Sequence, residues 1–437
     1  MTGQHGTCKG RRPLAIALAI AAVAAASPCH AVRIDYTIDA GVEHNDNVAL
    51  DDTREVRQNL FRAGLGFTVS EEGSRMLAEV TGRVEHYGYP EIFADRTEGT
   101  LDARAQWTLI PNRLTFNVDD DLSVQPIDAF VPDAPGNRQQ VNILSAGPSL
   151  LFGRGREFYG TVDLRHIRSD ADETDEFNSD RVHVAATVSR DLNATSQASL
   201  TAQRQQVRFD GDWLQDYDRG DAYLTYARHR GRIGLVVDAG YSWLTYDDGR
   251  DRSGPLLRTE ATYRPNDRSH FALRAWRQYS DAATQRLDAR TPGGAPPGRV
   301  PIGSMVIRGS QYREDRIALE YTYNGVHNTV TAEPFHYRAR YIEDGEFDQD
   351  GRGIRLGLSR RLSRTLSLSA WTEWEHVEYR RFYREVRMLH AGLSLRKNWT
   401  RHWQGRLDWT FYRHDTEPSD RMVDRNTVYL AIVYSSY

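Results

Sequence analysis

Apolar and polar residues alternate along most of the chain from Val32 onward. In the first such stretch, apolar side chains occupy the even positions from 32 to 42, and Arg33, Asp35, Thr37 and Asp39 lie between them. A period of two places successive side chains on opposite faces of a β-strand. The same alternation recurs at 61–70, 76–85, 233–243 and 403–411. The sequence therefore predicts many strands, each with one apolar and one polar face.

The connections between these stretches alternate between short and long. The short ones lie at 71–75, 110–113, 153–157, 228–232, 264–268, 323–328 and 360–365. The long polar ones lie at 45–57, 125–138, 168–181, 209–219, 247–254, 281–313, 342–352 and 415–425. This alternation is typical of an up-and-down barrel with short periplasmic turns and long extracellular loops. We expect an all-β transmembrane antiparallel barrel of about 20 strands, within a range of 18 to 20.

Residues 1–31 have the features of a cleaved secretory signal. Lys9, Arg11 and Arg12 precede an apolar run at 14–26 that is too short to span a bilayer as a helix, and Cys29-His30-Ala31 offers a cleavage site. We expect a single barrel domain at 32–437, because no composition shift or repeat array divides that stretch. Both cysteines lie in the signal, so no disulfide is expected in the mature fold.

Charge and hydropathy narrow the class of protein. Loss of the three basic signal residues leaves 53 basic against 60 acidic side chains, a net charge of -7, which gives no reason to expect a nucleic-acid partner. The mean hydropathy of -0.63 and the single long apolar run exclude a helical membrane protein. A membrane barrel remains compatible with these values, since only alternate residues of its strands contact lipid.

The polar faces of the predicted strands carry the candidate functional residues. If the apolar faces contact lipid, the lumen is lined by a mixture of arginines and carboxylates with two tryptophans. These candidate pore-lining residues are Arg33, Arg62, Arg83, Arg104, Arg165, Arg258, Arg274, Arg355, Arg406, Glu79, Glu85, Asp102, Asp119, Asp163, Glu260, Glu320, Trp276 and Trp371. In one interpretation the guanidinium groups hold passing carboxylate, phosphate or sugar hydroxyl groups. In the other, which is the commoner case for any single residue, they pair across strands and brace the wall. Trp276 and Trp371 are candidates for stacking against a carbohydrate ring.

The loop at 281–313 contains the Gly/Pro-rich segment 291–304. Two interpretations are open for this segment: a mobile surface loop, which loop behaviour in general favours, and a constriction folded into the lumen. No catalytic motif, cofactor motif or metal-ligand spacing is found, so we expect neither an enzyme nor a cofactor.

Two short stretches resemble known proteins. The end of the chain, Thr427 to Tyr437, resembles the C-terminal signal of bacterial outer-membrane barrels, which implies recognition by the barrel-assembly machinery. The stretch Gly41-Val-Glu-His-Asn-Asp46-Asn47-Val48 resembles the opening of outer-membrane β-barrel porins encoded beside exopolysaccharide or protein-sorting gene clusters. That resemblance implies passage or surface handling of an exported polysaccharide. From the residues alone, an Asx-turn after the first strand also accounts for Asp46 and Asn47.

We therefore expect a porin-like pore for polar solutes in the outer membrane of a Gram-negative bacterium, with membrane lipid and lipopolysaccharide as its surroundings. Two alternatives stay open. One is a barrel enzyme that acts on lipid A or peptides, which a His/Asp/Ser cluster at the outer rim would favour. The other is a closed scaffold or adhesin, which predicts a filled lumen without conductance.

Overall fold

The computed structural model describes residues 32–90, 92–128, 131–212, 214–288, 309–343, 345–418 and 421–436. The predicted signal at 1–31, the Gly/Pro-rich segment 291–304 and Tyr437 lie outside these ranges.

The described residues form one barrel of 20 strands. The first ten are β1 (Arg33–Asn45), β2 (Gln58–Glu72), β3 (Met76–Gly88), β4 (Arg96–Ile110), β5 (Leu114–Pro126), β6 (Arg138–Phe152), β7 (Tyr159–Ala171), β8 (Ser179–Asn193), β9 (Ser196–Phe209) and β10 (Tyr217–Arg230). The others are β11 (Ile233–Tyr246), β12 (Asp251–Asn266), β13 (Ser269–Ser280), β14 (Tyr312–Asn324), β15 (Asn328–Tyr341), β16 (Gln349–Arg361), β17 (Leu366–Tyr379), β18 (Arg384–Asn398), β19 (Trp403–Glu417) and β20 (Arg421–Ser435).

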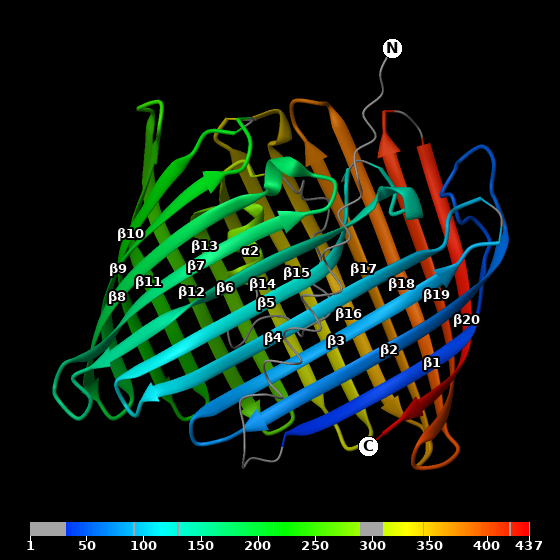
Figure 1. Cartoon of the computed structure of the whole chain (residues 1–437), viewed down its shortest axis with the longest axis horizontal. Helices are drawn as coiled ribbons and strands as arrows, with labels where there is room; N and C mark the ends of the chain where they lie inside the picture. Colours follow the sequence, from blue (N-terminus) through cyan, green and yellow to red (C-terminus); the bar gives the residue numbers. More distant parts are fainter. Residues whose placement is uncertain are drawn as a thin grey trace.

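Each strand pairs antiparallel with the next in sequence, and β20 pairs with β1, so the sheet closes on itself (Figure 1). The predicted all-β up-and-down barrel and its number of strands are confirmed. Helical structure within the described part is limited to α2 (Ala282–Asp288) and three short 3-10 turns, η1 (Pro135–Asn137), η2 (Asp175–Phe177) and η3 (Gly345–Phe347). Among these residues, no helix has the length and apolar character needed to cross a bilayer.

The connections separate into two rims. Those that follow even-numbered strands are tight and form what we call the short-turn rim; those that follow odd-numbered strands form the long-loop rim. The short/long alternation of the sequence is present over most of the barrel, but the connections after β11, β17 and β19 have only three or four positions. Two long connections were therefore predicted wrongly. The one at 247–254 covers only 247–250, because residues 251–254 already pair with β11, and the one at 415–425 covers only 418–420, because β19 continues to Glu417 and β20 begins at Arg421.

The two faces of the sheet differ as the alternation predicts. The outer face presents apolar side chains, with Leu200, Leu224 and Leu430 exposing 60%, 54% and 62% of their surface. The opposite face is the inner one. Asp281 lies in the connection after β13, yet it contacts Arg181 of β8 and Tyr217 of β10, and neither strand is a neighbour of β13 in the sheet. Residues of such distant strands can meet only inside the barrel. Every candidate lining residue can thus be assigned to a face by register.

A small polar cluster closes the seam between the first and last strands at the long-loop rim. The Asp46 carboxylate accepts hydrogen bonds from the backbone N–H of Asn426 at 2.6 Å and from its side-chain amide at 2.9 Å. The Asn47 amide donates to the carbonyl oxygen of Asp424 at 3.1 Å. We call Asp46, Asn47 and Asn426 the seam clamp. The Asx-turn interpretation of Asp46 is therefore incomplete, since its carboxylate bonds β20 rather than its own turn.

Gly41 is required at the seam by a close approach of two backbones. A Cβ atom at this position would overlap the carbonyl oxygen of Leu430 in β20. We expect Gly41→Ala to lower the free energy of unfolding by about 1 to 3 kcal/mol, because backbone cannot move aside as a flexible side chain can. Urea unfolding of the refolded barrel in detergent measures this loss. Gly136→Ala is the control, because a Cβ there meets nothing within 4 Å; an equal loss in both variants would contradict the assignment.

Candidate functional site

The candidate site is the inner wall of the barrel. The strand register places all eighteen candidate residues on the inner face: Arg62 lies opposite Tyr87, Arg258 opposite Trp276, and Arg355 opposite Glu373, and the others alternate in phase with these pairs. That a solute passes over these residues stays a prediction. The contacts of each side chain then decide which interpretation of the wall applies.

Arg62 and Arg83 are held in one network of carboxylates on β1 and β3. The Arg62 guanidinium lies 2.6 Å from Glu85 and 3.2 Å from Glu43. Arg83 lies 2.7 Å from Asp39 and 2.8 Å from the same Glu85. Each guanidinium thus has two carboxylate partners, which join it to the neighbouring positions of the wall.

The arginines of β12 and β13 are bound in a similar way. Arg274 lies 2.9 Å from Glu320 on β14 and 3.6 Å from Glu260 on β12. The Arg258 guanidinium donates to the side-chain oxygen of Gln278 at 2.6 Å. These contacts join three successive strands across their inner faces.

Arg355 shows the same arrangement on the far side of the barrel. It lies 2.6 Å from Glu333 on β15 and 2.8 Å from Glu373 on β17, so one side chain bridges two neighbouring strands. For these arginines the bracing interpretation is the one that the contacts support.

Most of the remaining charged candidates pair along a strand. Arginine and aspartate two positions apart on the same face approach each other as follows: Arg33 and Asp35 at 2.6 Å, Arg104 and Asp102 at 3.7 Å, Arg165 and Asp163 at 3.3 Å, Arg406 and Asp408 at 2.5 Å. Arg33 is also largely exposed, at 68%. Asp119 lies opposite Arg104 in the register, and Glu79 is exposed on the inner face.

The two inner tryptophans are engaged with other side chains. The Trp276 indole N–H donates to Glu314 at 2.7 Å, and the Arg316 guanidinium lies 5.6 Å from the centre of its ring. Trp371 makes an edge contact with His390, with 6.4 Å between the ring centres. Trp276 is therefore already stacked with a cation, which leaves less of its surface for a carbohydrate ring.

The loop that begins at residue 281 enters the lumen and is anchored there. Both carboxylate oxygens of Asp281 lie within hydrogen-bonding distance of one guanidinium nitrogen of Arg181, at 2.8 and 2.9 Å, and the carboxylate accepts a hydrogen bond of 2.8 Å from the Tyr217 hydroxyl. The backbone N–H and the hydroxyl of Thr284 donate to the same carboxylate. We call Asp281, Arg181 and Tyr217 the loop anchor. Arg181 and Asp281 expose only 1% and 2% of their side chains.

The anchor is strong enough to hold the Asp281 carboxylate ionised despite its burial. Burial alone would raise its pKa, but the Arg181 guanidinium and the hydrogen bonds of Thr284 and Tyr217 outweigh that effect and lower the pKa to about 2.

An apolar contact supports the anchor. Ala282 and Ala283 of α2 pack against Val141 and Ile143 of β6 and Phe177 of η2, all of them buried. Val141 and Ile143 lie on the inner face, where most positions are polar. Helix α2 covers these two residues, which explains why they are apolar on a mostly polar face. The described start of the loop thus occupies part of the lumen near the long-loop rim.

The far end of the same loop is also attached to the inner wall. The Tyr246 hydroxyl donates to the side-chain oxygen of Gln311 at 3.0 Å, and Gln311 donates to the carbonyl of Gly309 at 2.8 Å. Both described flanks of the 281–313 loop therefore face inward, whereas segment 291–304, on which the two interpretations rested, lies outside the described residues.

The loop anchor was missed in the sequence because its members lie at element boundaries. Arg181 ends a predicted loop and Asp281 begins another, so no alternation assigned their direction. A usable signal was the pair Val141 and Ile143, two apolar residues at inner-face positions. Within the described ranges, no group of three or more His, Cys, Asp or Glu side chains is arranged to hold a metal ion.

Comparisons with known proteins give structural neighbours only. No protein-family model matches the sequence, and no curated protein matches it significantly. An apoprotein form of the FrpB iron transporter of Neisseria meningitidis is similar at 8% identity and a TM-score of 0.49, over 92% of this chain and 81% of that one. The siderophore receptor PirA of Pseudomonas aeruginosa has 10% identity and a TM-score of 0.45, over 94% and 81%. OccAB3 of Acinetobacter baumannii has 8% identity and a TM-score of 0.40, over 92% and 98%. Likeness at this level does not assign a function.

Proposed function

We propose that this protein is a porin-like pore for polar solutes in the outer membrane of a Gram-negative bacterium. The observation that carries the proposal is the division of the closed sheet into an apolar outer face and a charged inner face. In hydrocarbon every backbone N–H and C=O needs a partner within the protein, which a closed barrel supplies. A ring of 20 strands is too wide for wall side chains alone to fill, so a polar space remains.

In this proposal the short-turn rim lies in the periplasm and the long-loop rim outside, as in other outer-membrane barrels. Lipid surrounds the outer face, lipopolysaccharide lies near the long loops, and the barrel-assembly machinery binds the C-terminal strand. The solute that the resemblance of the Gly41 to Val48 stretch implies is an exported polysaccharide.

The anchored loop sets how wide the path is. Helix α2 covers the inner faces of β6 and β7, so it narrows the lumen on that side near the long-loop rim. We expect the unmodified mature chain to conduct through the remaining space.

Conductance in planar bilayers tests the proposal. The refolded mature chain is compared with a variant in which residues 282–308 are replaced by a short Gly/Ser linker. We expect discrete conductance steps from both proteins, with larger steps from the variant. Heat-modifiable mobility on gels serves as the folding control for each.

Two other outcomes separate the alternatives. Steps from the variant alone would indicate a closed scaffold whose lumen is filled by the loop. Silence from both proteins, once both are shown to be folded and inserted, would contradict the pore.

A further inference from the structure

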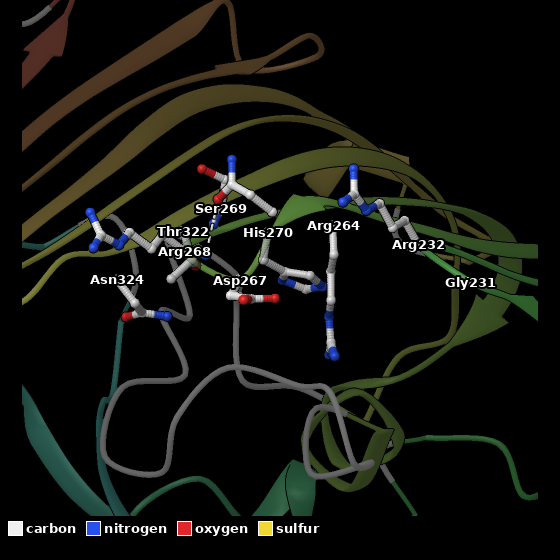
Figure 2. Close-up of a pocket in the computed structure, with 10 residues that line it drawn as sticks. Gly231, Arg232, Arg264, Asp267, Arg268, Ser269, His270, Thr322 and Asn324 are labelled. Carbon is white, nitrogen blue, oxygen red and sulfur yellow. Dashed lines mark hydrogen bonds between the residues drawn. The ribbon is translucent and has the colours of Figure 1, made fainter.

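A basic pocket of about 500 Å³ lies at the short-turn rim, where the β10–β11 and β12–β13 turns meet the end of β14 (Figure 2). Its cationic lining comes from Arg232, Arg264, Arg268 and His270, and Asn324 and Thr322 add polar groups. One carboxylate, Asp267, belongs to the lining. Three guanidinium groups against one carboxylate give the pocket a net positive charge even with His270 neutral.

The pocket guanidinium groups differ from those of the inner wall in their partners. Arg62, Arg83, Arg274 and Arg355 each lie within ion-pair distance of two carboxylates. By contrast, Arg232, Arg264 and Arg268 are exposed, and the described part of the chain places no carboxylate within 4.0 Å of their guanidinium nitrogens. Their donors are therefore available to a ligand.

The pocket faces the mouth of the lumen. His270 pairs with Thr322 in the register, and both continue the inner-face alternation of Ala272 and Glu320. Arg264 follows Thr262, which faces inward, and lies within a register shift between Tyr263 and Asn266. Such irregularities re-aim side chains at strand ends. Figure 2 shows Arg264 and His270 extending from β12 and β13 in the same general direction. A solute at this mouth would meet these groups first.

Other turns of the same rim also carry positive charge. The short-turn rim between β10 and β19 has Arg228, Arg230, Arg360, Arg361, Arg364, Arg396, Lys397 and Arg401. Of those within strands, Arg361 and Arg396 have the inner-face parity of β16 and β18, whereas Arg228, Arg230, Arg360 and Lys397 have the outer-face parity. Charges of one sign around an opening attract ions of the other sign and raise their local concentration.

We propose that this pocket binds a carboxylate or phosphate group of a multivalent anionic solute at the short-turn mouth of the barrel. Guanidinium groups bind both oxyanions through paired N–H donors, so the two chemistries share one site. Asn324 and Thr322 supply further polar contacts to the same group. The statement that the bound solute approaches a pore rests on the proposed function. Binding itself requires no conducting path.

Binding is measured on the full mature chain in a zwitterionic detergent by isothermal titration calorimetry. The two probes are trigalacturonate, which carries carboxylates, and tripolyphosphate. The test variant is Arg232→Gln/Arg264→Gln/Arg268→Gln. The matched control is Arg75→Gln/Arg113→Gln/Arg156→Gln, which removes the same charge from exposed arginines on other turns of the same rim.

We expect at least one probe to bind, with affinity that falls as NaCl is added, since the contacts are ionic. The test variant should lose about tenfold or more in affinity, whereas the control should stay within about twofold of the wild type. The probe that binds more tightly identifies the source of the oxyanion.

Absence of binding by both probes, or equal losses in the test and control variants, would overturn the site. Because the measurement uses no membrane, a protein that binds but does not conduct refutes only the proposed function, and one that conducts but does not bind refutes only this inference.

Discussion

Replacing Asp281 with alanine is expected to detach α2 from the barrel wall and to lower the free energy of unfolding by about 3 to 5 kcal/mol. The variant leaves Arg181 as an unpaired charge, although only 1% of its side chain is exposed. Removing one partner of a buried ion pair is strongly destabilising because the other charge stays buried without compensation. Urea unfolding in detergent measures the stability, and hydrogen exchange at 281–288 reports whether the helix is released.

The double variant Arg181→Met/Asp281→Leu is the control for this prediction. It removes both charges and keeps apolar volume at the site, so we expect it to lie closer to the wild type than Asp281→Ala does. A double variant as unstable as the single one would show that α2 is held by other contacts.

Acid should weaken the same anchor. The folded pKa of Asp281, about 2, lies below its ordinary value of 3.8, so its stabilising contribution is complete above about pH 4 and is lost as the pH falls toward 2. The difference corresponds to about 2 kcal/mol. The acid dependence of α2 exchange should disappear in the double variant.

Replacing Leu224 with arginine is expected to lower the free energy of unfolding in lipid vesicles by about 2 to 4 kcal/mol. Leu224 lies near the middle of β10 with 54% of its surface exposed on the outer face, and a charge at mid-depth in a bilayer has a cost of this size. The measurement is a urea titration followed by tryptophan fluorescence.

Thr225→Arg is the matched control because the next residue along β10 points inward. The Thr225 hydroxyl donates to Asp238 at 2.8 Å, so an arginine there would find an anionic partner. We expect a loss below about 1 kcal/mol for this variant. If Thr225→Arg were the more damaging of the two, the inner and outer faces would be assigned the wrong way round.

The architecture followed from the sequence because the period of two is a local signal. Ile34, Ile38 and Val42 needed no knowledge of their neighbours to be placed on one face, and the even number of strands followed from the alternation of turns and loops. The same local signal placed Arg62 and Arg355 on the polar side.

The partners of those residues depend on which strands lie side by side and in which register. Nothing near Arg355 in the sequence shows that it bridges Glu333 and Glu373, or that Trp276 is covered by Arg316. The ion pair of Arg181 and Asp281 joins residues 100 positions apart across the lumen. Contacts of this kind come from the closed three-dimensional arrangement, which one sequence does not specify position by position.

The seam clamp has a consequence for how the barrel is made. Asp46 and Asn426 are separated by 380 positions, so their hydrogen bonds cannot form until β20 has been synthesised and lies beside β1. Every other pair of neighbouring strands is consecutive in the sequence, so its contacts are local and can form without the rest of the ring. A chain interrupted before β20 would have two unpaired edge strands, and such edges can pair with another molecule and aggregate. Pairing of β20 with β1 removes both edges.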